Sequence, residues 1–224
     1  MELFPINLRL QGRNVVIVGG GRVALQKCLS LLPAGAAITV IAPELTAPLC
    51  TLRDEGKIDH RQRAFAPEDL DGVFMIFAAT DDPAVNSAVA AAAVARQILV
   101  AAVDHQERGN FTTPAILRRG ELTIAVSTGG KSPALARNIR DQLAKRYGSE
   151  YDEALTILGA VREKLLTASD NTAYNKKILN DLAASELAKL LKRRRYQEVD
   201  RLLTNLLGPG YTTTELGVQS KDRP

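Results

Sequence analysis

The stretch NVVIVGGGRVALQK, from Asn14 to Lys27, decides the fold expected of this chain. Asn14 is followed by four apolar, β-branched residues, which predicts a buried strand of a parallel sheet over residues 14–18. Gly19, Gly21 and Ala24 follow in the G-x-G-x-x-A spacing, and the next eleven residues, from Arg22, carry apolar side chains at helical intervals. A strand, a glycine turn and a helix in this order begin a dinucleotide-binding unit, in which the pyrophosphate lies on the helix N-terminus.

The same alternation of strands and helices continues outward from this stretch. Further strands are expected over 37–42, 72–80 and 98–104, and helices over 43–56 and 83–96. Asp82 is expected to cap the last of these helices, because Pro83 at the first helical position suits an N-terminus. This alternation is typical of a doubly wound parallel sheet, so we predict an α/β, Rossmann-like NAD-binding domain over residues 1–113.

The pattern changes after residue 113. Two short strands around Arg119–Gly120 predict an antiparallel hairpin, and Ser132 is expected to cap a helix over 133–146. The sequence after residue 147 has a helical pattern, which ends at Gly208. Three parts should therefore follow the first domain: a hairpin-plus-helix segment for dimerisation and substrate binding (114–146), an all-α domain (147–208) and a flexible tail (209–224).

Composition favours a cytoplasmic globular protein. Hydrophobic residues make up 46% of the chain and charged residues 24%, as in ordinary soluble domains. We find no apolar run of about 18 residues and no signal peptide, so no membrane partner is expected. The two cysteines, Cys28 and Cys50, and the two histidines, His60 and His105, follow no known metal-ligand spacing, so no resident metal is expected.

The net charge of +4 is concentrated in one part of the chain. Residues 114–146 contain seven Lys or Arg and two Asp or Glu, a net charge of +5. A local positive field indicates an anionic partner, although a solvated basic helix face explains the charge equally well. Aromatic residues are only 4% of the chain and offer no stacking surface, so a small polyanion fits better than nucleic acid.

The basic segment contains the stretch STGGKSPALAR, which resembles a phosphate-binding loop. A P-loop requires a first glycine at position 125, which is Ala125, and Pro133 follows the serine at once. The stretch still suits an anion, because two glycines allow an exposed turn before a capped helix N-terminus. We therefore predict binding of substrate carboxylates by this stretch, at Thr128, Gly129, Gly130, Lys131, Ser132 and Arg137.

Ligands of open α/β sheets bind beyond the carboxyl ends of the strands. Glu44 follows the second strand later than the acidic residue that usually holds the ribose, and we see no arginine at that end, which favours NAD over NADP. Asp81 and Asp104 follow later strands. Asp104 at an apolar strand tip could act as a general base or cap the loop, and the residues alone leave both open.

Four segments in this order carry a family resemblance: VVIVGGGRVALQK, FAATDDPAVN, AAVDHQERGNFTTPAIL and LTIAVSTGGKSPALAR. Over residues 1–150 the chain resembles the precorrin-2 dehydrogenase / sirohydrochlorin ferrochelatase family, the N-terminal module of siroheme synthase. The resemblance implies NAD-dependent oxidation of precorrin-2 to sirohydrochlorin, and in many members insertion of Fe²⁺ as a second substrate to give siroheme. It also implies a homodimer formed largely by residues 114–146. The fused methyltransferase of some members is not expected in a chain of this length.

The resemblance implies roles for particular residues. Asp104 matches the catalytic aspartate, which takes a proton as hydride leaves the macrocycle, and Asp104 or His105 are candidates for transient contacts with the metal. The cofactor site is implied at Gly19, Gly20, Gly21, Arg22, Val23, Pro43, Glu44, Thr80 and Asp81.

The alternative is an NAD-sensing regulatory domain that binds the same cofactor without catalysis. Such domains usually keep the acidic residue at the second strand end, which favours the enzyme here. Turnover of precorrin-2 with appearance of NADH would separate the two hypotheses.

Overall fold

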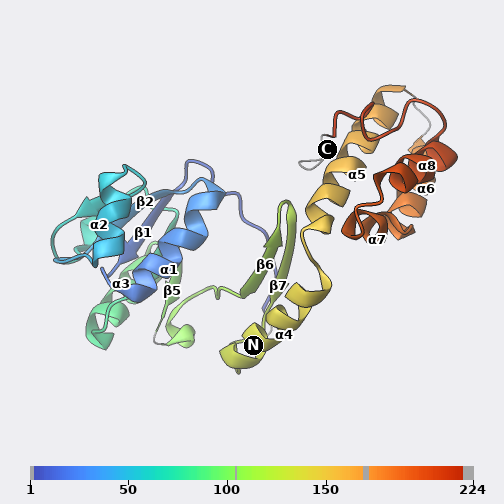
Figure 1. Cartoon of the computed structure of the whole chain (residues 1–224). Coiled ribbons are helices and arrows are strands. Elements are labelled where there is room, and N and C mark those ends of the chain that lie inside the picture. Colours follow the sequence, from blue (N-terminus) through green and yellow to red (C-terminus); the bar gives the residue numbers. More distant parts are fainter. Residues whose placement is uncertain (1–2, 104, 169–171, 219–224) are drawn as a thin grey trace. The chain divides into compact units, whose positions relative to one another are not determined.

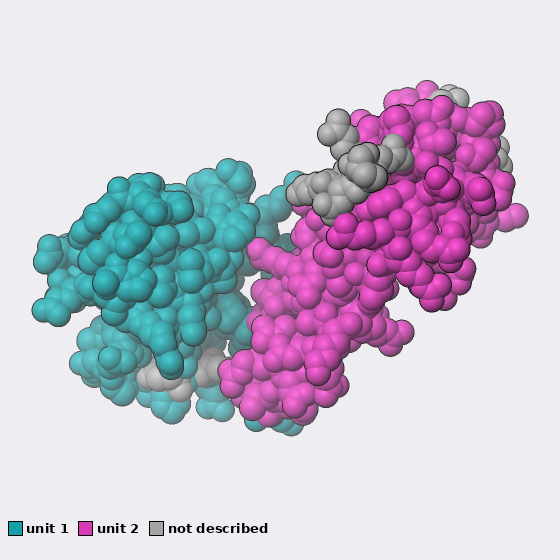
Figure 2. Space-filling view, viewed as in Figure 1, with its two compact units in different colours: residues 1–113, 129–131 teal, residues 114–128, 132–224 magenta. Residues whose placement is uncertain are grey.

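The computed structural model describes residues 3–103, 105–168 and 172–218, with the side chains of residues 106, 168 and 172–174 left out of the description. The chain divides into two compact units. Unit 1 consists of residues 1–113 with 129–131, and unit 2 of residues 114–128 with 132–224 (Figure 2).

Unit 1 is a five-stranded parallel sheet with helices on both faces, which confirms the predicted Rossmann-like class (Figure 1). The strand order is β3-β2-β1-β4-β5, so the order reverses between β1 and β4. The strands are β1 (Asn14–Val18), β2 (Ala37–Ile41), β3 (Asp59–Arg61), β4 (Met75–Ala78) and β5 (Leu99–Ala102). The helices are α1 (Arg22–Leu31), α2 (Ala47–Asp54) and α3 (Pro83–Ala95), with short 3₁₀ turns η1 (Leu32–Ala34), η2 (Pro67–Leu70) and η3 (Gln106–Arg108).

Alternate side chains of the strands build two separate cores. Ile17 and Phe77 point to the face covered by α1 and α2, where they pack with Ala24 and Leu49. The other face, under α3, contains Val16, Ile41, Leu70, Ile76 and Val89. Burial on both faces explains why the sequence of the central strands is continuously apolar rather than alternating.

Several predicted boundaries differ from the structure. The helix expected over 43–56 is only α2, because residues 43–45 run along the glycine turn and the Thr46 amide bonds the Gly20 carbonyl at 3.0 Å. The strands expected over 72–80 and 98–104 correspond to β4 over Met75–Ala78 and β5 over Leu99–Ala102. Residues 72–74, 79–80, 98 and 103 lie in turns or loops, and residue 104 lies outside the described residues. β3 was not predicted, because its three residues Asp-His-Arg have no apolar signal.

A buried carboxylate holds the segment that follows β3. The Asp69 side chain is only 1% exposed and accepts two bonds from Arg63, at 2.6 and 2.7 Å, and one from Arg61 at 2.5 Å. The Ala66 amide donates to the same carboxylate at 2.9 Å. We call Asp69, Arg61 and Arg63 the Asp69 cluster.

Unit 2 begins with an antiparallel hairpin of β6 (Ala115–Arg119) and β7 (Leu122–Val126), which confirms the predicted hairpin. Arg119 and Leu122 are directly paired at its turn. Helix α4 (Pro133–Arg146) packs on the hairpin and begins where predicted, with Ser132 Oγ accepting from the Leu135 amide at 3.2 Å. This bond confirms Ser132 as the N-cap.

Four further helices form the second part of unit 2: α5 (Glu150–Ala168), α6 (Thr172–Ala184), α7 (Leu187–Lys192) and α8 (Tyr196–Leu207). Their core includes Ile157, Val161, Leu182, Val199 and Leu203. The sequence over residues 174–193 reads as one helical pattern, but the structure divides it between α6 and α7. Ser185 Oγ donates to the Leu182 carbonyl at 2.6 Å and accepts from the Leu187 amide at 3.2 Å, so its side chain ends one helix and starts the next.

Residues 211–218 differ from the flexible tail expected over 209–224. Tyr211, Leu216 and Val218 pack on the core of the four helices, and Thr213 is 3% exposed. The Thr213 amide donates to Asp200 at 2.7 Å. The sequence of this segment is mostly polar, so the packing of these three apolar side chains was not predicted. Their partners are far away in the sequence.

The Asp69 cluster generates a pH-dependent prediction. The hydrogen bonds from Arg63 hold the pKa of the Asp69 carboxyl well below its usual range, at about 2, with smaller contributions from Ala66 and Arg61 and an opposing effect of burial. A carboxyl whose pKa is lower in the folded than in the unfolded chain stabilises the fold above the unfolded value, and this stabilisation is lost as pH falls through the folded value.

We therefore expect Asp69→Asn to lower the free energy of unfolding at pH 7, with the pH-dependent part of the loss on the order of 1–2 kcal/mol after solvent screening. The gap from the unmodified chain should narrow as pH falls from about 4 towards about 2. Denaturant unfolding over this range measures it, with the exposed pair variant Asp54→Asn as control. A gap independent of pH would contradict the assigned role.

Candidate functional site

The glycine turn between β1 and α1 lies at the carboxyl edge of the sheet, where the strand order reverses. Gly19 has φ +124°, and a Cβ there would lie 2.3 Å from the Ala79 carbonyl oxygen. A Cβ on Gly20 would lie 1.9 Å from the Glu44 carbonyl oxygen. Side chains are therefore excluded at both positions, and the turn touches the backbone after β2 and after β4.

Gly21 differs from its two neighbours because the space beside it is open. A Cβ on Gly21 would meet no atom within 4 Å, and its backbone is the N-cap of α1. In the described part of the chain, no side chain caps this N-terminus, and its first turn has no acidic residue. The first amides of α1, including those of Arg22 and Val23, are therefore available to an anion, and the helix dipole favours one.

The segment after β2 forms a wall beside this turn. Pro43 and Glu44 are exposed, and the Glu44 backbone packs against Gly20. The Gly19 amide donates to the Ile41 carbonyl at 2.9 Å, which joins the turn to the end of β2. The structure thus brings residues 19–23 and 43–44 together, as the cofactor prediction requires.

A buried amide that the sequence did not reveal holds the segment after β4. Asn86, which is 1% exposed on α3, accepts from the Thr80 amide at 3.1 Å and from Thr80 Oγ1 at 2.8 Å. It also donates to the Thr80 carbonyl at 3.0 Å. Asp82 accepts from the Ala84 amide at 2.7 Å, which confirms it as N-cap of α3. Asp81, between these fixed residues, is exposed to solvent beside the turn.

Asp104, the predicted catalytic residue, lies outside the described residues. The described chain leaves β5 at Val103, whose amide donates to the Ala78 carbonyl at 3.0 Å. His105 is exposed, and its carbonyl accepts from the Arg108 amide at 3.1 Å. The first of these bonds holds Val103 beside the end of β4, at the carboxyl edge of the sheet.

The chain returns along β5 after η3, where the side-chain amide of Asn110 pairs with the backbone of β5. Asn110 accepts from the Val100 amide at 2.8 Å and donates to the Ile98 carbonyl at 2.9 Å, as a neighbouring strand would. Phe111 then packs edge-on against Phe77, with ring centroids 5.5 Å apart.

Lys27 of α1 fixes the end of this return. Its Nζ donates to Thr113 Oγ1 at 2.9 Å and lies 5.1 Å from the Phe77 ring centroid. Burial lowers the pKa of the Lys27 ammonium. α1 therefore follows the glycine turn of residues 19–21 at its N-terminus, and through Lys27 near its middle it also holds Thr113, the end of this return.

The second glycine stretch forms a tight turn before α4. Gly129 and Gly130 have φ of +58° and +81°, and Thr128 Oγ1 accepts from the Ser132 amide at 3.1 Å. Lys131 is exposed. The turn is therefore open to solvent, and its role in binding substrate stays a prediction.

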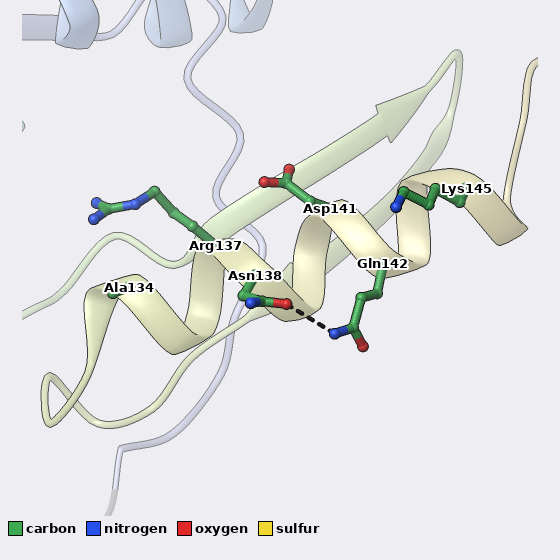
Figure 3. Close-up of a pocket in the computed structure, with 6 residues that line it drawn as sticks. All are labelled: Ala134, Arg137, Asn138, Asp141, Gln142 and Lys145. Atoms are coloured by element: carbon green, nitrogen blue, oxygen red, sulfur yellow. Dashed lines mark hydrogen bonds between the residues drawn. The ribbon is translucent and has the colours of Figure 1, made fainter.

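Arg137 lies on an exposed polar face of α4 (Figure 3). Side chains at helical spacing form one face of the helix and border a shallow hollow of about 430 Å³. They are Ala134, Arg137, Asn138, Asp141, Gln142 and Lys145. Asn138 accepts from Gln142 at 2.8 Å, so the middle of this face is joined along the helix.

Part of the positive charge of residues 114–146 has a structural role. Arg119 donates to the carbonyls of Tyr147 and Ala144, at 3.1 and 3.4 Å, and so caps the C-terminal end of α4. Arg140 pairs with Asp141 at 2.6 Å. Fewer cationic side chains of this segment are therefore free to bind an anionic ligand than the sequence suggested.

Within residues 3–103, 105–168 and 172–218, no three His, Cys, Asp or Glu side chains gather in a way that could hold a metal ion. No helix among the described residues combines the length and apolar character needed to cross a bilayer.

Comparison with known proteins assigns both glycine turns to matched modules. Residues 6–115 match a family model described as putative NAD(P)-binding, and residues 119–146 match one described as sirohaem biosynthesis protein central. The first match contains the turn at residues 19–21, and the second contains the turn at residues 129–130.

The chain is also similar to curated proteins named siroheme synthase. The protein of Chromobacterium violaceum is 45% identical over 165 residues, 69% of this chain and 35% of that protein. The protein of Gluconacetobacter diazotrophicus is 36% identical over 217 residues, 95% of this chain and 46% of that protein. The chain therefore spans less than half the length of these relatives.

A solved structure titled SirC, precorrin-2 dehydrogenase, has the same fold. The TM-score is 0.73 at 29% identity, and the match covers 89% of this chain and 100% of that chain. The parallel sheet, the hairpin and the helical region thus have a counterpart in one protein.

Gly21 offers a direct test of the cofactor site. We expect Gly21→Ala to fold with a melting temperature within a few degrees of the unmodified chain, because the space for a Cβ is open and the loss of an N-cap glycine costs at most about 1 kcal/mol. Affinity for NAD⁺ should fall at least tenfold, because the methyl group occupies the approach of the pyrophosphate. Calorimetric titration measures the affinity. Unchanged NAD⁺ binding would remove the turn from the cofactor site.

Proposed function

We propose that this chain, which belongs to the siroheme synthase and precorrin-2 dehydrogenase family, oxidises precorrin-2 to sirohydrochlorin with NAD⁺. The activity of the longer relatives is not carried over as a whole, because the chain spans less than half their length. The dehydrogenase step is the part that a dinucleotide domain and its following segment would perform.

The observation that carries this proposal is the open N-terminus of α1. Gly19 and Gly20 have no room for side chains, whereas Gly21 faces open space beside uncapped helix amides. This combination suits a pyrophosphate that approaches the backbone closely, as a dinucleotide does. Cofactor-binding roles for Arg22, Val23, Pro43, Glu44, Thr80 and Asp81 are proposed on the same ground.

The reaction removes a hydride and a proton from the macrocycle. NAD⁺ held at residues 19–23 would supply the hydride acceptor, and the carboxylate of Asp104 would accept the proton. β5, which comes before position 104 in the sequence, and β1, which comes before the glycine turn, end at the same edge of the sheet. This arrangement supports the proposal, because ligands of parallel sheets bind beyond the carboxyl ends of the strands.

The substrate of this reaction carries eight carboxylates, as the family resemblance implies. Lys131 and Arg137 are exposed cations in the basic segment, and Thr128 and Ser132 order the turn between them. We propose these residues, with Gly129 and Gly130, as partners of the carboxylates.

An anaerobic assay with precorrin-2 and NAD⁺ tests the activity. We expect NADH to appear at 340 nm with the unmodified chain, and Asp104→Asn to lower kcat by about 10²-fold or more while NAD⁺ still binds, because a general base contributes this much. A chain that binds NAD⁺ and gives no NADH would instead be the NAD-sensing alternative. Unchanged turnover of the variant would remove Asp104 from the mechanism.

The same assay tests the substrate residues. Arg137→Gln should raise KM for precorrin-2 and leave KM for NAD⁺ unchanged, because its charge-assisted bonds go to carboxylates. Lys189→Gln, an exposed lysine on α7 paired with Glu186, is the matched control. A rise in both KM values would argue that Arg137 acts on the structure.

Added Fe²⁺ in a second arm of the assay would read metal insertion, the other activity that the resemblance implies. Asp104 and His105 are the candidates for transient contacts with this substrate metal. NADH and metallated product are measured separately, so each activity has its own result.

We also propose a homodimer formed through residues 114–146. Within the described chain β6 and β7 form a sheet of their own, so each strand keeps an unpaired edge. Two strands alone are marginally stable, and unpaired edges favour addition of another chain. Ile116 on β6 and Leu135 on α4 are 37% and 52% exposed, which gives a partner copy apolar surface to cover.

Light scattering after size exclusion measures this state. We expect the mass of two chains for the unmodified protein and of one chain for Ile116→Asp, because a charge at the covered position opposes association. Leu29→Asp, at an exposed leucine of α1 in unit 1, should keep the mass of two chains. A dimer of Ile116→Asp would place the interface elsewhere.

A cytoplasmic location follows as part of the proposal. Both cysteines are free thiols, Cys28 is buried, and burial raises the pKa of its thiol to about 11, so it is unreactive. Free structural thiols suit a reducing compartment.

A further inference from the structure

The Asp69 cluster lies beside the half of the cofactor site that would hold adenosine. β3 runs parallel to β2, with Arg61 opposite Ile41, and the Ala42 amide donates to the Arg61 carbonyl at 3.2 Å. His60 Nε2 lies 2.9 Å from the Ala42 carbonyl oxygen. Arg61 and Arg63 therefore stand at the same sheet edge as the segment after β2, one strand further out.

The direction of the dinucleotide follows from the topology. Its pyrophosphate would lie at the switch between β1 and β4, and its adenosine ribose beyond β2. A 2′-phosphate on that ribose would point away from the centre of the sheet, where the next strand end is that of β3. Dinucleotide domains that use NADP commonly have an arginine near this position.

The charge of the cluster suits a phosphate. One carboxylate faces two guanidinium groups, so the cluster keeps a net charge of +1. The Arg61 and Arg63 side chains are 50% and 47% exposed, although Asp69 beneath them is buried. Arg63 is held by two parallel bonds to Asp69, which fixes the plane of its guanidinium. A fixed, half-exposed arginine loses little freedom when it binds an anion.

Two carboxylates oppose this interaction: Glu68, whose charge acts on Arg63, and Glu44. Glu44 is the acidic residue nearest in sequence after β2, it is exposed, and a carboxylate there favours a ribose hydroxyl over a phosphate. The site would thus contain two groups that oppose the 2′-phosphate of NADP⁺ and two that favour it.

We propose that Arg61 and Arg63 bind the 2′-phosphate of NADP⁺, so that unit 1 binds NADP⁺ as well as NAD⁺. The proposal rests on dinucleotide binding at residues 19–23, and it extends the expectation of NAD alone. That expectation relied on the absence of an arginine after the second strand. Strand β3, which ends at Arg61 and leads to Arg63, was not predicted. Asp69 orients both guanidinium groups and is a positioning residue.

Calorimetric titration with each dinucleotide tests the proposal through the ratio of Kd for NADP⁺ to Kd for NAD⁺. We expect the ratio to lie below about ten for the unmodified chain and to rise about tenfold in Arg63→Gln, because a charge-assisted bond to phosphate is lost. Arg61→Gln should act in the same direction. Arg53→Gln, an exposed arginine on α2 paired with Asp54, is the matched control and should leave the ratio unchanged.

Glu44→Gln gives a result of opposite sign, so the proposal stays testable if an arginine variant fails to fold. Its ratio should fall, because a negative charge near the phosphate is removed. If the unmodified chain binds NAD⁺ but NADP⁺ more than 100-fold more weakly, or if no variant moves the ratio, the inference is overturned and the proposed function stands. If neither dinucleotide binds, the proposed function itself fails.

Discussion

The close approach of the glycine turn to two neighbouring strand ends is the constraint on which the structure of unit 1 depends. A side chain at residue 19 would collide with the backbone after β4, and one at residue 20 with the backbone after β2. Because both are glycine, three segments that are distant in sequence meet at one edge of the sheet. The next residue, Gly21, is free of this crowding and leaves the N-terminus of α1 open. The space that results is the cofactor site that we propose.

The loops at this edge are held by polar side chains rather than by secondary structure. Asn86 holds the segment after β4, Asn110 takes the place of a strand beside β5, and Asp69 ties together the segment after β3. The buried groups, Asn86 and Asp69, are paired, so their burial costs little. Hydrogen bonds thus order irregular backbone at the edge where we propose the cofactor.

The elements with local signals could be predicted from the sequence. The buried strand before Gly19 and the caps at Asp82 and Ser132 depend on residues within a few positions of one another. The contacts of Asn86, Asn110 and Asp69 could not be predicted, since an asparagine or aspartate has the same sequence signal whether its side chain binds a distant segment or water. β3 was missed because a polar three-residue strand has no period, and Arg119 was read as free charge although it caps α4.

The chain contains two glycine turns before helices. We propose that the first binds the dinucleotide and that the second binds substrate carboxylates. The measurement that separates them most directly is an NMR titration of the labelled chain with NAD⁺, read at the backbone amides of both turns. We expect the amide resonances of Gly21, Arg22 and Val23 to change chemical shift on binding, because these amides would donate to the pyrophosphate. Shifts confined to residues 129–132, with no change at residues 19–23, would contradict this proposal.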